Sequence, residues 1–271
     1  MRHCYGISSQ VCGKMDINTA FSKISKAGFS NIEILMEPPY FDASDTNITN
    51  VQILAQKYGL AVQVGHSPIE NTDCGSVDES QRIASIDIIG ACFGPLAAIG
   101  VEIVVVHING PLTEYTHQNR QASLAQSKKS LVELSQQAES ADIKIAVENL
   151  PHHSMPRPGH SMTEIQELIA DLPENVGLCL DVGHSKISGH DPVEELRIAA
   201  SRLFSVHLQD VNGQKDCHWV PGKGIIDWDA LISELDNMKF SGPRIIEAIP
   251  STKNFDPVLK ECYNVVEQWC K

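Results

Sequence analysis

Residues 102–150 contain two apolar runs, EIVVVHI (102–108) and KIAVENL (144–150), on either side of a helix-like pattern at 117–140. Short runs rich in valine and isoleucine are typical of strands, and the segment between them has the length and apolar spacing of a helix. This part of the chain therefore predicts one strand–helix–strand unit.

The same alternation extends to both ends of the 271-residue chain. Strand-like runs lie at 3–9, 31–37, 61–67, 102–108, 144–150, 177–182, 203–209 and 244–250. Helix-like patterns lie at 16–28, 47–59, 78–99, 117–140, 161–171, 191–202, 227–238 and 254–270. Eight alternations in about 250 residues predict an α/β protein, a (β/α)8 TIM barrel, as a single domain over residues 1–271. The alternative is an open doubly wound sheet, which fits less well because no G-x-G-x-x-G turn follows the first strand.

Several predicted helices carry local start and stop signals. Aspartates precede two of them, a Ser-x-x-Glu pattern suits a capping box, and one has proline at its first position. Glycines end three helices before the next strand. The residues that carry these signals are Asp16, Asp78, Ser161 with Glu164, Asp191-Pro192, Gly28, Gly59 and Gly100.

The composition is that of an ordinary globular chain, with 42% hydrophobic and 20% charged residues. No run approaches the roughly 18–20 apolar residues of a membrane span, and the N-terminus has no apolar signal core. The eight cysteines are scattered, so we expect a reduced, cytoplasmic protein. The net charge of −13 argues against a nucleic-acid partner without excluding one, because bound metal ions would add positive charge.

A barrel enzyme places its functional groups where the strands end and in the loops that follow. Acids and imidazoles occupy those positions in most of the predicted strands. Residue parity agrees: if Glu148 faces the barrel interior so does Ala146, and if His107 does so do Val105 and Ile103. The residues concerned are His66, His107, Glu148, Asp181, His184, His207, Asp216, His218 and Glu247.

Each of these residues has an ordinary explanation when it is taken alone. A histidine that ends a strand is more often a hydrogen-bonded polar residue than a ligand, and an aspartate there commonly caps a turn or helix. Together they are different, because four carboxylates on one rim would repel each other without a cation. The set therefore predicts binding of a divalent metal, Zn²⁺ or Mn²⁺, with two or three ions possible.

Other polar residues near the predicted rim carry weaker signals. His152, His153 and His160 lie in a proline-rich loop, where solvent exposure is a better expectation than substrate contact. Arg157 in that loop is a possible anion contact. Lys223, between glycines, is a candidate for binding substrate.

Seven motifs give the chain a resemblance to a known family. They are VGHSP, VVHING, VENLP, LDVGH, VHLQD, DCHWVPGKGIIDW and IIEAIP, and they run from residue 64 to residue 250. The chain resembles the xylose isomerase-like TIM-barrel superfamily, which holds sugar-phosphate isomerases and epimerases together with endonuclease IV, an AP endonuclease of family 2. The eightfold pattern extends the match to nearly the whole chain.

The resemblance implies two ligand sets that share a core. In the sugar epimerases one divalent metal is held at the positions of Glu148, Asp181, His207 and Glu247. In endonuclease IV further ligands complete a three-zinc cluster. The positions added there match His66, His107, His184, Asp216 and His218.

The sequence around these ligands favours a sugar substrate. The stretch HSPIENTD (66–73) lacks the aromatic residue that helps endonuclease IV grip DNA, and no stripe of Lys and Arg suggests a phosphate track. We therefore expect a metal-dependent sugar or sugar-phosphate isomerase or epimerase, with Glu148 and Glu247 as its acid–base pair and His184 orienting a hydroxyl. The alternatives are a multi-zinc phosphoesterase of the endonuclease IV type, another hydrolase or lyase, and a non-catalytic metal-binding protein. The particular sugar and the oligomeric state stay open.

Overall fold

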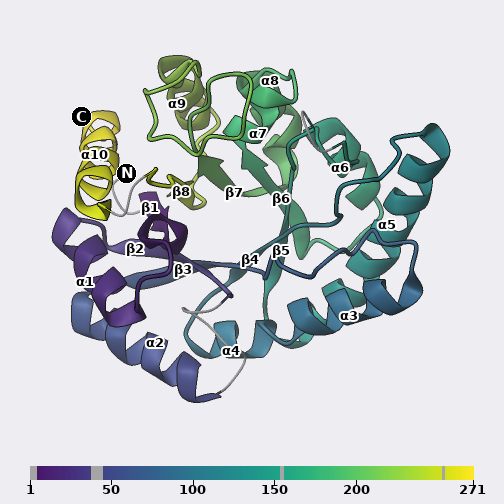
Figure 1. The fold of residues 1–271 in the computed structure, drawn as a ribbon, viewed down its shortest axis with the longest axis horizontal. Helices are drawn as coiled ribbons and strands as arrows, with labels where there is room; N and C mark the ends of the chain where they lie inside the picture. The colour runs from purple at the N-terminus through teal and green to yellow at the C-terminus, as the bar shows by residue number, and fades with distance from the viewer. Residues whose placement is uncertain (1–4, 38–44, 153–155, 252–253) are drawn as a thin grey trace.

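Eight parallel strands close into a barrel in the order of the sequence, with the helices outside them (Figure 1). The computed structural model describes residues 5–37, 45–152, 156–251 and 254–271. The strands are β1 (Tyr5–Ser8), β2 (Asn31–Leu35), β3 (Ala61–His66), β4 (Ile103–Val106), β5 (Lys144–Glu148), β6 (Val176–Asp181), β7 (Leu203–Leu208) and β8 (Arg244–Ile246). The predicted (β/α)8 fold is confirmed, and β1 pairs with β8 to close the ring.

The helices follow the predicted alternation with two differences. They are α1 (Ile17–Ala27), α2 (Asp45–Tyr58), α3 (Glu79–Gly90), α4 (Phe93–Ala98), α5 (His117–Ser140), α6 (Met162–Ile169), α7 (Val182–Ile187), α8 (Pro192–Ala199), α9 (Trp228–Asn237) and α10 (Phe255–Trp269), with short 3-10 helices η2 (Ser9–Cys12) and η3 (Ala200–Arg202). The single helix predicted at 78–99 is wrong, because the chain breaks into α3 and α4. Pro95 has no N–H for the carbonyl of Ala91, and its ring clashes there, so one continuous helix cannot form. The second difference is α7, which the sequence did not predict.

Most helix-end signals act as predicted. Asp16 accepts a hydrogen bond from the Thr19 amide at 3.0 Å, and Asp78 and Ser161 cap their helices in the same way. The capping box at Ser161 is only half formed, because the Glu164 carboxylate accepts from the Gly159 amide instead. No helix in the described parts of the chain combines the length and apolar character needed to cross a membrane.

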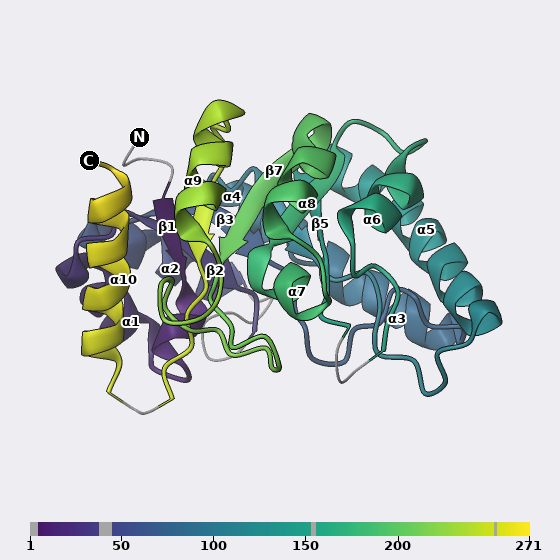
Figure 2. The same cartoon turned by 90° about the horizontal axis from the view of Figure 1, so that it is seen from above.

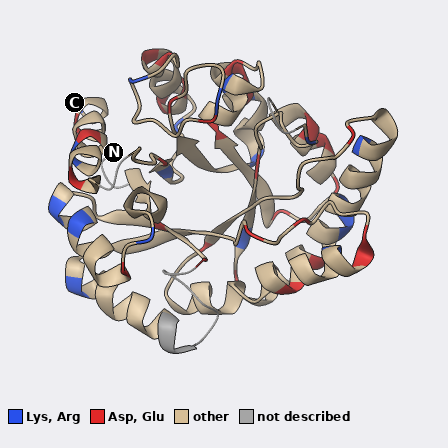
Figure 3. Cartoon of the chain, viewed as in Figure 1, with Lys and Arg blue, Asp and Glu red and all other residues tan. Residues whose placement is uncertain are grey.

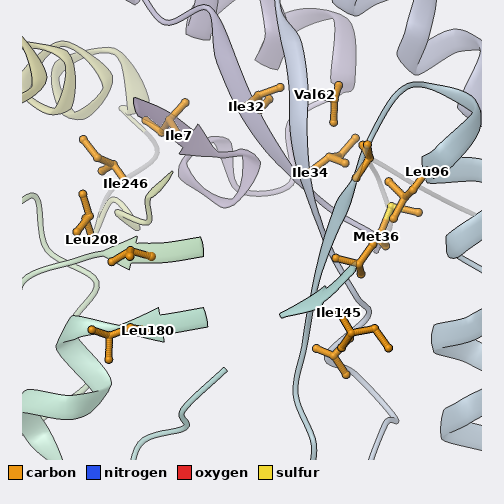
Figure 4. Packing of buried hydrophobic residues seen from close by; sticks show 14 of the residues in the cluster. Ile7, Ile32, Ile34, Met36, Val62, Leu96, Ile145, Leu180, Leu208 and Ile246 are labelled. Atoms are coloured by element: carbon orange, nitrogen blue, oxygen red, sulfur yellow. The ribbon is translucent and has the colours of Figure 1, made fainter. Parts of the chain in front are cut away.

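Two apolar layers stabilise the barrel. Successive side chains of a strand point alternately to one layer and to the other, as Val104 and Val105 do. The larger layer lies between strands and helices; Figure 4 shows part of it, including Ile145 and Leu208. The smaller one fills the barrel interior with Val64, Val105, Ala146, Cys179 and Ile245. This confirms the parity expected for β4 and β5.

The interior layer fixes where the polar site lies. Each of its residues precedes a candidate site residue by two positions, so both point inward and the polar one is nearer the carboxyl end of its strand. The five site residues placed in this way are His66, His107, Glu148, Asp181 and Glu247. Figure 2 shows the loops after β7 and β8 on the same side of the barrel as α7, which follows β6 directly.

Candidate metal centre

Glu148, at the end of β5, is the hub of the site and is 1% exposed. Its Oε2 lies 3.2 Å from His66 Nε2 and 3.0 Å from His107 Nε2. Its Oε1 lies 3.3 Å from His184 Nδ1 and 3.4 Å from His207 Nδ1. One carboxylate therefore joins imidazoles from four different parts of the rim.

Three groups of side chains present ligand atoms that lie within 4.8 Å of one another, close enough to share a cation. Together they contain all nine predicted metal-binding residues, and Glu148 belongs to two of them. The groups are His66–His107–Glu148, His184–Asp216–His218 and Glu148–Asp181–His207–Glu247. The structure thus brings together the predicted residues as candidate sites for divalent metal, without identifying the ion.

Hydrogen bonds on the far side of the rings orient three of these histidines. Nε2 of His207 lies 2.9 Å from Oε2 of Glu33, a buried carboxylate of β2. That contact leaves Nδ1 of His207 facing the centre, where it makes no hydrogen bond within the described residues. Nδ1 of His66 and of His184 lie 2.8 and 2.9 Å from backbone carbonyls, which leaves each Nε2 available. Contacts of this kind set the tautomer of a metal-binding histidine.

Asp181 has two roles, because it is a candidate ligand and also the N-cap of α7. Its Oδ1 accepts from the His184 amide at 2.6 Å, which makes it the N-cap of that helix. Asn149 brackets Asp181 by accepting from its amide and donating to its carbonyl. The three-residue spacing in DVGH thus places the His184 ring beside the Asp181 carboxylate.

Asp216 and His218 come from the loop after β7. Asp216 lies 3.2 Å from His184 Nε2 through Oδ2 and 3.1 Å from His218 Nδ1 through Oδ1. Gln209 connects this loop to the strand, because its Nε2 donates to Asp216 at 2.9 Å and lies 3.2 Å from Oδ2 of Asp181. His218 adopts a left-handed backbone conformation, with φ of 46°.

Buried Asp210 holds the rest of that loop in place. Its Oδ2 accepts from the amides of Gly222 and Gly224 at 2.9 Å and from the indole of Trp228 at 2.8 Å. Its backbone pairs with that of Trp219 at 2.8 and 2.9 Å. The loop that carries Asp216 and His218 is thereby closed around one carboxylate.

Acidic neighbours keep several imidazoles protonated in spite of their burial. Burial alone would lower the pKa of His66, but its hydrogen bond to Glu148 outweighs that effect and raises the pKa to about 9. For His218 the bond to Asp216 likewise overcomes burial, and the pKa rises to about 10. His107 is the exception, because burial lowers its pKa.

The carboxylates show the complementary effect. Burial opposes ionisation of Glu148 and Glu247, but the charge on His207 holds the pKa of both well below the usual range. Burial raises the pKa of Asp181 to about 7. Protons on the imidazoles and a divalent cation are therefore alternative ways to compensate these acids.

A pocket of about 220 Å³ opens onto the centre. Four of its lining residues were not singled out in the sequence for this site: Gln10, Ile69, Leu150 and Pro151. Of these, Gln10 donates to Glu247 Oε1 at 2.8 Å. Gln10 gave no signal, because it follows β1 in a short 3-10 helix. Glu33 could have been found, because a carboxylate inside the apolar strand NIEIL needs a buried partner.

The remaining candidates lie at different distances from this pocket. Arg157 lines it and is 9% exposed. Lys223 does not line it; its ammonium lies 3.3 Å from Glu261 and borders a neighbouring cavity. His152 and His160 stack on each other with ring centroids 4.2 Å apart, and His153 lies outside the described residues.

Comparisons with known proteins agree with this architecture. A model of the family described as "Xylose isomerase-like TIM barrel" matches residues 21–262. An uncharacterized protein of Methanocaldococcus jannaschii is 26% identical over 97% of this chain and 90% of its own length. D-psicose 3-epimerase of Enterocloster bolteae is 24% identical over 86% of this chain and 76% of its own length.

Two further matches show how widely the scaffold is used. A probable endonuclease 4 of Clostridium botulinum is 34% identical, but over only 30% of this chain and 35% of its own length. The crystal structure of a D-tagatose 3-epimerase-like protein superposes with a TM-score of 0.83 at 24% identity, covering 98% of this chain and 99% of that one. The latter match shows a shared fold.

Proposed function

Because the chain belongs to the xylose isomerase-like TIM-barrel family, we propose that it is a metal-dependent sugar isomerase or epimerase that moves a proton at the carbon beside a ketose carbonyl. The observation that carries this proposal is the buried group Glu148–Asp181–His207–Glu247, in which three carboxylates and one imidazole present ligand atoms to one point. Two relatives that match most of the chain are a D-psicose 3-epimerase and a ketose 3-epimerase.

The donor set fits a divalent cation. Nδ1 of His207 is buried, makes no hydrogen bond within the described residues, and has carboxylate oxygens of Glu148 and Glu247 at 3.4 and 3.3 Å. Three oxygen donors and one nitrogen suit Mn²⁺, and the nearby His66 and His107 shift the preference toward Zn²⁺. When bound, the cation would stabilise negative charge on the carbonyl oxygen of the substrate.

Proton transfer is assigned to the two glutamates. Glu148 on β5 and Glu247 just after β8 approach the His207 ring from different strands, and a lowered pKa keeps both ionised at neutral pH. One ionised carboxylate removes the proton beside the carbonyl and becomes a carboxylic acid, which can return that proton to the neighbouring carbon in an isomerisation. In an epimerisation the other glutamate would first take up a proton from solvent and then deliver it from its own side. Nε2 of His184 would orient a substrate hydroxyl.

Exchange with heavy water tests this proposal. A ketose incubated with the metal-loaded protein should gain deuterium at the carbon beside its carbonyl. Exchange should collapse in Glu148→Gln and in Glu247→Gln, because an amide keeps the shape but cannot act as a base. Metal content is measured in both variants, since these residues are also proposed ligands. Stoichiometric metal with no exchange across a broad ketose panel would overturn the proposal.

A second candidate function is hydrolysis of a phosphoester by several cations. The observation that favours it is the pair of additional groups, His66–His107–Glu148 and His184–Asp216–His218. Clustered cations can activate water and stabilise the leaving oxygen. Such an enzyme would exchange no carbon-bound hydrogen and would cleave DNA at abasic sites in a way that depends on His66 and His107. Figure 3 speaks against a DNA track, because Lys and Arg are scattered over helices, strands and loops in the described parts of the chain and form no continuous stripe.

A further inference from the structure

A second and larger cavity, of about 530 Å³, lies next to the metal centre. His218 lines both this cavity and the 220 Å³ pocket, so the two are neighbours that share this residue. Small-molecule sites usually occupy about 300–1,000 Å³. The pocket at the metal centre falls below that range and its neighbour falls within it, which indicates that a substrate reaching the metal could extend across His218.

The cavity is built from the loops after β7 and β8, which Figure 2 shows on the same side of the barrel. The amide of Ile249 donates to the carbonyl of His218 at 2.8 Å, which ties one loop to the other. The backbone pair between Trp219 and Asp210 fixes the next residue along. The walls of the cavity are thus anchored to the same loop that places His218 in the metal centre.

The main surface of the cavity is aromatic and aliphatic. Trp219 lines it with an exposure of 39%, and Ile249 lines it with an exposure of 43%. The indole of Trp219 stacks on no other ring in the described residues, unlike that of Trp228. An exposed indole beside aliphatic side chains suits a ligand with a flat apolar face and polar edges.

The charges at the rim select among such ligands. The ammonium of Lys223, which lines the cavity, lies 3.3 Å from the Glu261 carboxylate. The pair presents a donor, the Lys223 ammonium, and an acceptor, the Glu261 carboxylate, with little net charge. The chain as a whole carries a net charge of −13. These features fit hydroxyl groups better than a phosphate, because a phosphate would need unpaired positive charge.

We propose that this cavity binds a second sugar ring, so that the preferred substrate is a ketose linked to another sugar. The indole of Trp219 receives the C–H face of that ring, and Lys223 with Glu261 contacts its hydroxyls. The inference rests on the proposed function, since it names the class of ketose that the metal centre receives.

Calorimetric titration of the Mn²⁺-loaded protein tests the inference, with fructose compared against two ketose disaccharides, lactulose and isomaltulose. At least one disaccharide should bind more tightly than fructose. Trp219→Ala should weaken that disaccharide about threefold to tenfold, as loss of an aromatic contact does, and leave fructose unchanged. Trp219→Phe should keep most of the affinity. The matched control is Ile225→Ala, on the same loop and 52% exposed but outside the cavity lining.

The outcomes separate this inference from the proposed function. Disaccharides that bind no more tightly than fructose, or a Trp219→Ala effect equal for all three sugars, would overturn the second-ring site even if fructose exchanges deuterium. Disaccharide binding that depends on Trp219, without deuterium exchange in any ketose, would support the site and refute the isomerase or epimerase proposal. Melting temperatures of the variants show that each one is folded.

Discussion

At the scale of single residues, the centre is a balance between buried acids and protonated imidazoles. Glu148 contacts four histidines, and the charge on His207 lowers the pKa of both Glu148 and Glu247. A cation that enters this site must displace protons from the rings that bind it.

This balance predicts how metal affinity depends on pH. The raised pKa of His66, about 9, and of His218, about 10, means that both rings are protonated at neutral pH. A cation using either ring gains affinity as pH rises through the neutral range to about 9, well above the window of an ordinary histidine near 6.5. Competition with a fluorescent chelator measures this trend for Mn²⁺. His117→Gln, a change in an exposed histidine at the start of α5, should keep the same slope, and a constant affinity between pH 7 and pH 9 would contradict histidine ligation.

Glu33 supports a second prediction at this scale. Its carboxylate accepts from Nε2 of His207 and thereby aims Nδ1 at the centre. Glu33→Gln can offer an N–H in place of an acceptor, which favours the wrong tautomer, so affinity for Mn²⁺ should fall about 10–100-fold. The control is Glu37→Gln, four residues further along the chain, because Glu37 does not contact His207. Equal metal content in the two variants would show that Glu33 has no positioning role.

The residue-scale site was largely predictable, and its supporting contacts were not. The ends of the predicted strands and the segments that directly follow them were enough to collect the nine candidate ligands at one rim, and parity supported the placement of Glu148 and His107. Gln10 gave no signal and its partner, Glu247, lies 237 positions away in the sequence. Glu33 stands out as a carboxylate in an apolar strand, but its partner, His207, lies 174 positions away and could not be named. Only the closed barrel shows which strand ends face each other.

At the scale of elements, the loop from β7 to α9 depends on Asp210. Its carboxylate accepts from two glycine amides and from the Trp228 indole, all on the far part of the loop. Because several donors share one acceptor, the loop is held as a unit. In the short helix α7 one carboxylate likewise has two roles, because Asp181 is both the N-cap of the helix and a candidate ligand.

Asp210→Asn should therefore alter the loop that carries Asp216 and His218, although Asp210 itself does not line the pocket. The amide can accept fewer of these bonds, and unpaired buried donors cost about 1–3 kcal/mol each, so unfolding free energy should drop by at least that amount. Asp216 and His218 should lose their fixed positions, while the group around His207 keeps its metal. Urea unfolding and metal analysis measure both effects, with exposed Asp229→Asn as the control. A variant with normal stability would show that the loop is held elsewhere.

Element boundaries were predicted well where caps or apolar periodicity mark them. Helix α1, between its N-cap Asp16 and its C-cap Gly28, is an example. Helix α7 was not predicted, because six residues are too few to show a helical period. The break between α3 and α4 was not predicted, although Pro95 is the kind of residue that interrupts a helix.

At the scale of the whole molecule, the four residues of the group Glu148–Asp181–His207–Glu247 come from β5, β6, β7 and the segment after β8, so one cation held there would tie together half of the barrel. Binding to the folded state alone raises the unfolding free energy, by about 2.7 kcal/mol at a hundredfold excess over Kd. We therefore expect the melting temperature to be several degrees higher in Mn²⁺ than in EDTA. Asp181→Ala should abolish that difference. An equal melting temperature in Mn²⁺ and EDTA for the unaltered protein would contradict a cation at this position.

The two-residue offset between the apolar interior layer and the polar rim has an evolutionary consequence. Val64, Val105 and Ala146 fill the barrel, and the candidate ligands His66, His107 and Glu148 occupy the next inward position of each strand. A substitution at the rim can therefore alter a reaction while the packing beneath it stays intact. In barrels of this kind new substrates can therefore be reached by small steps, because the residues that pack the interior and the residues at the rim are different positions of the same strand.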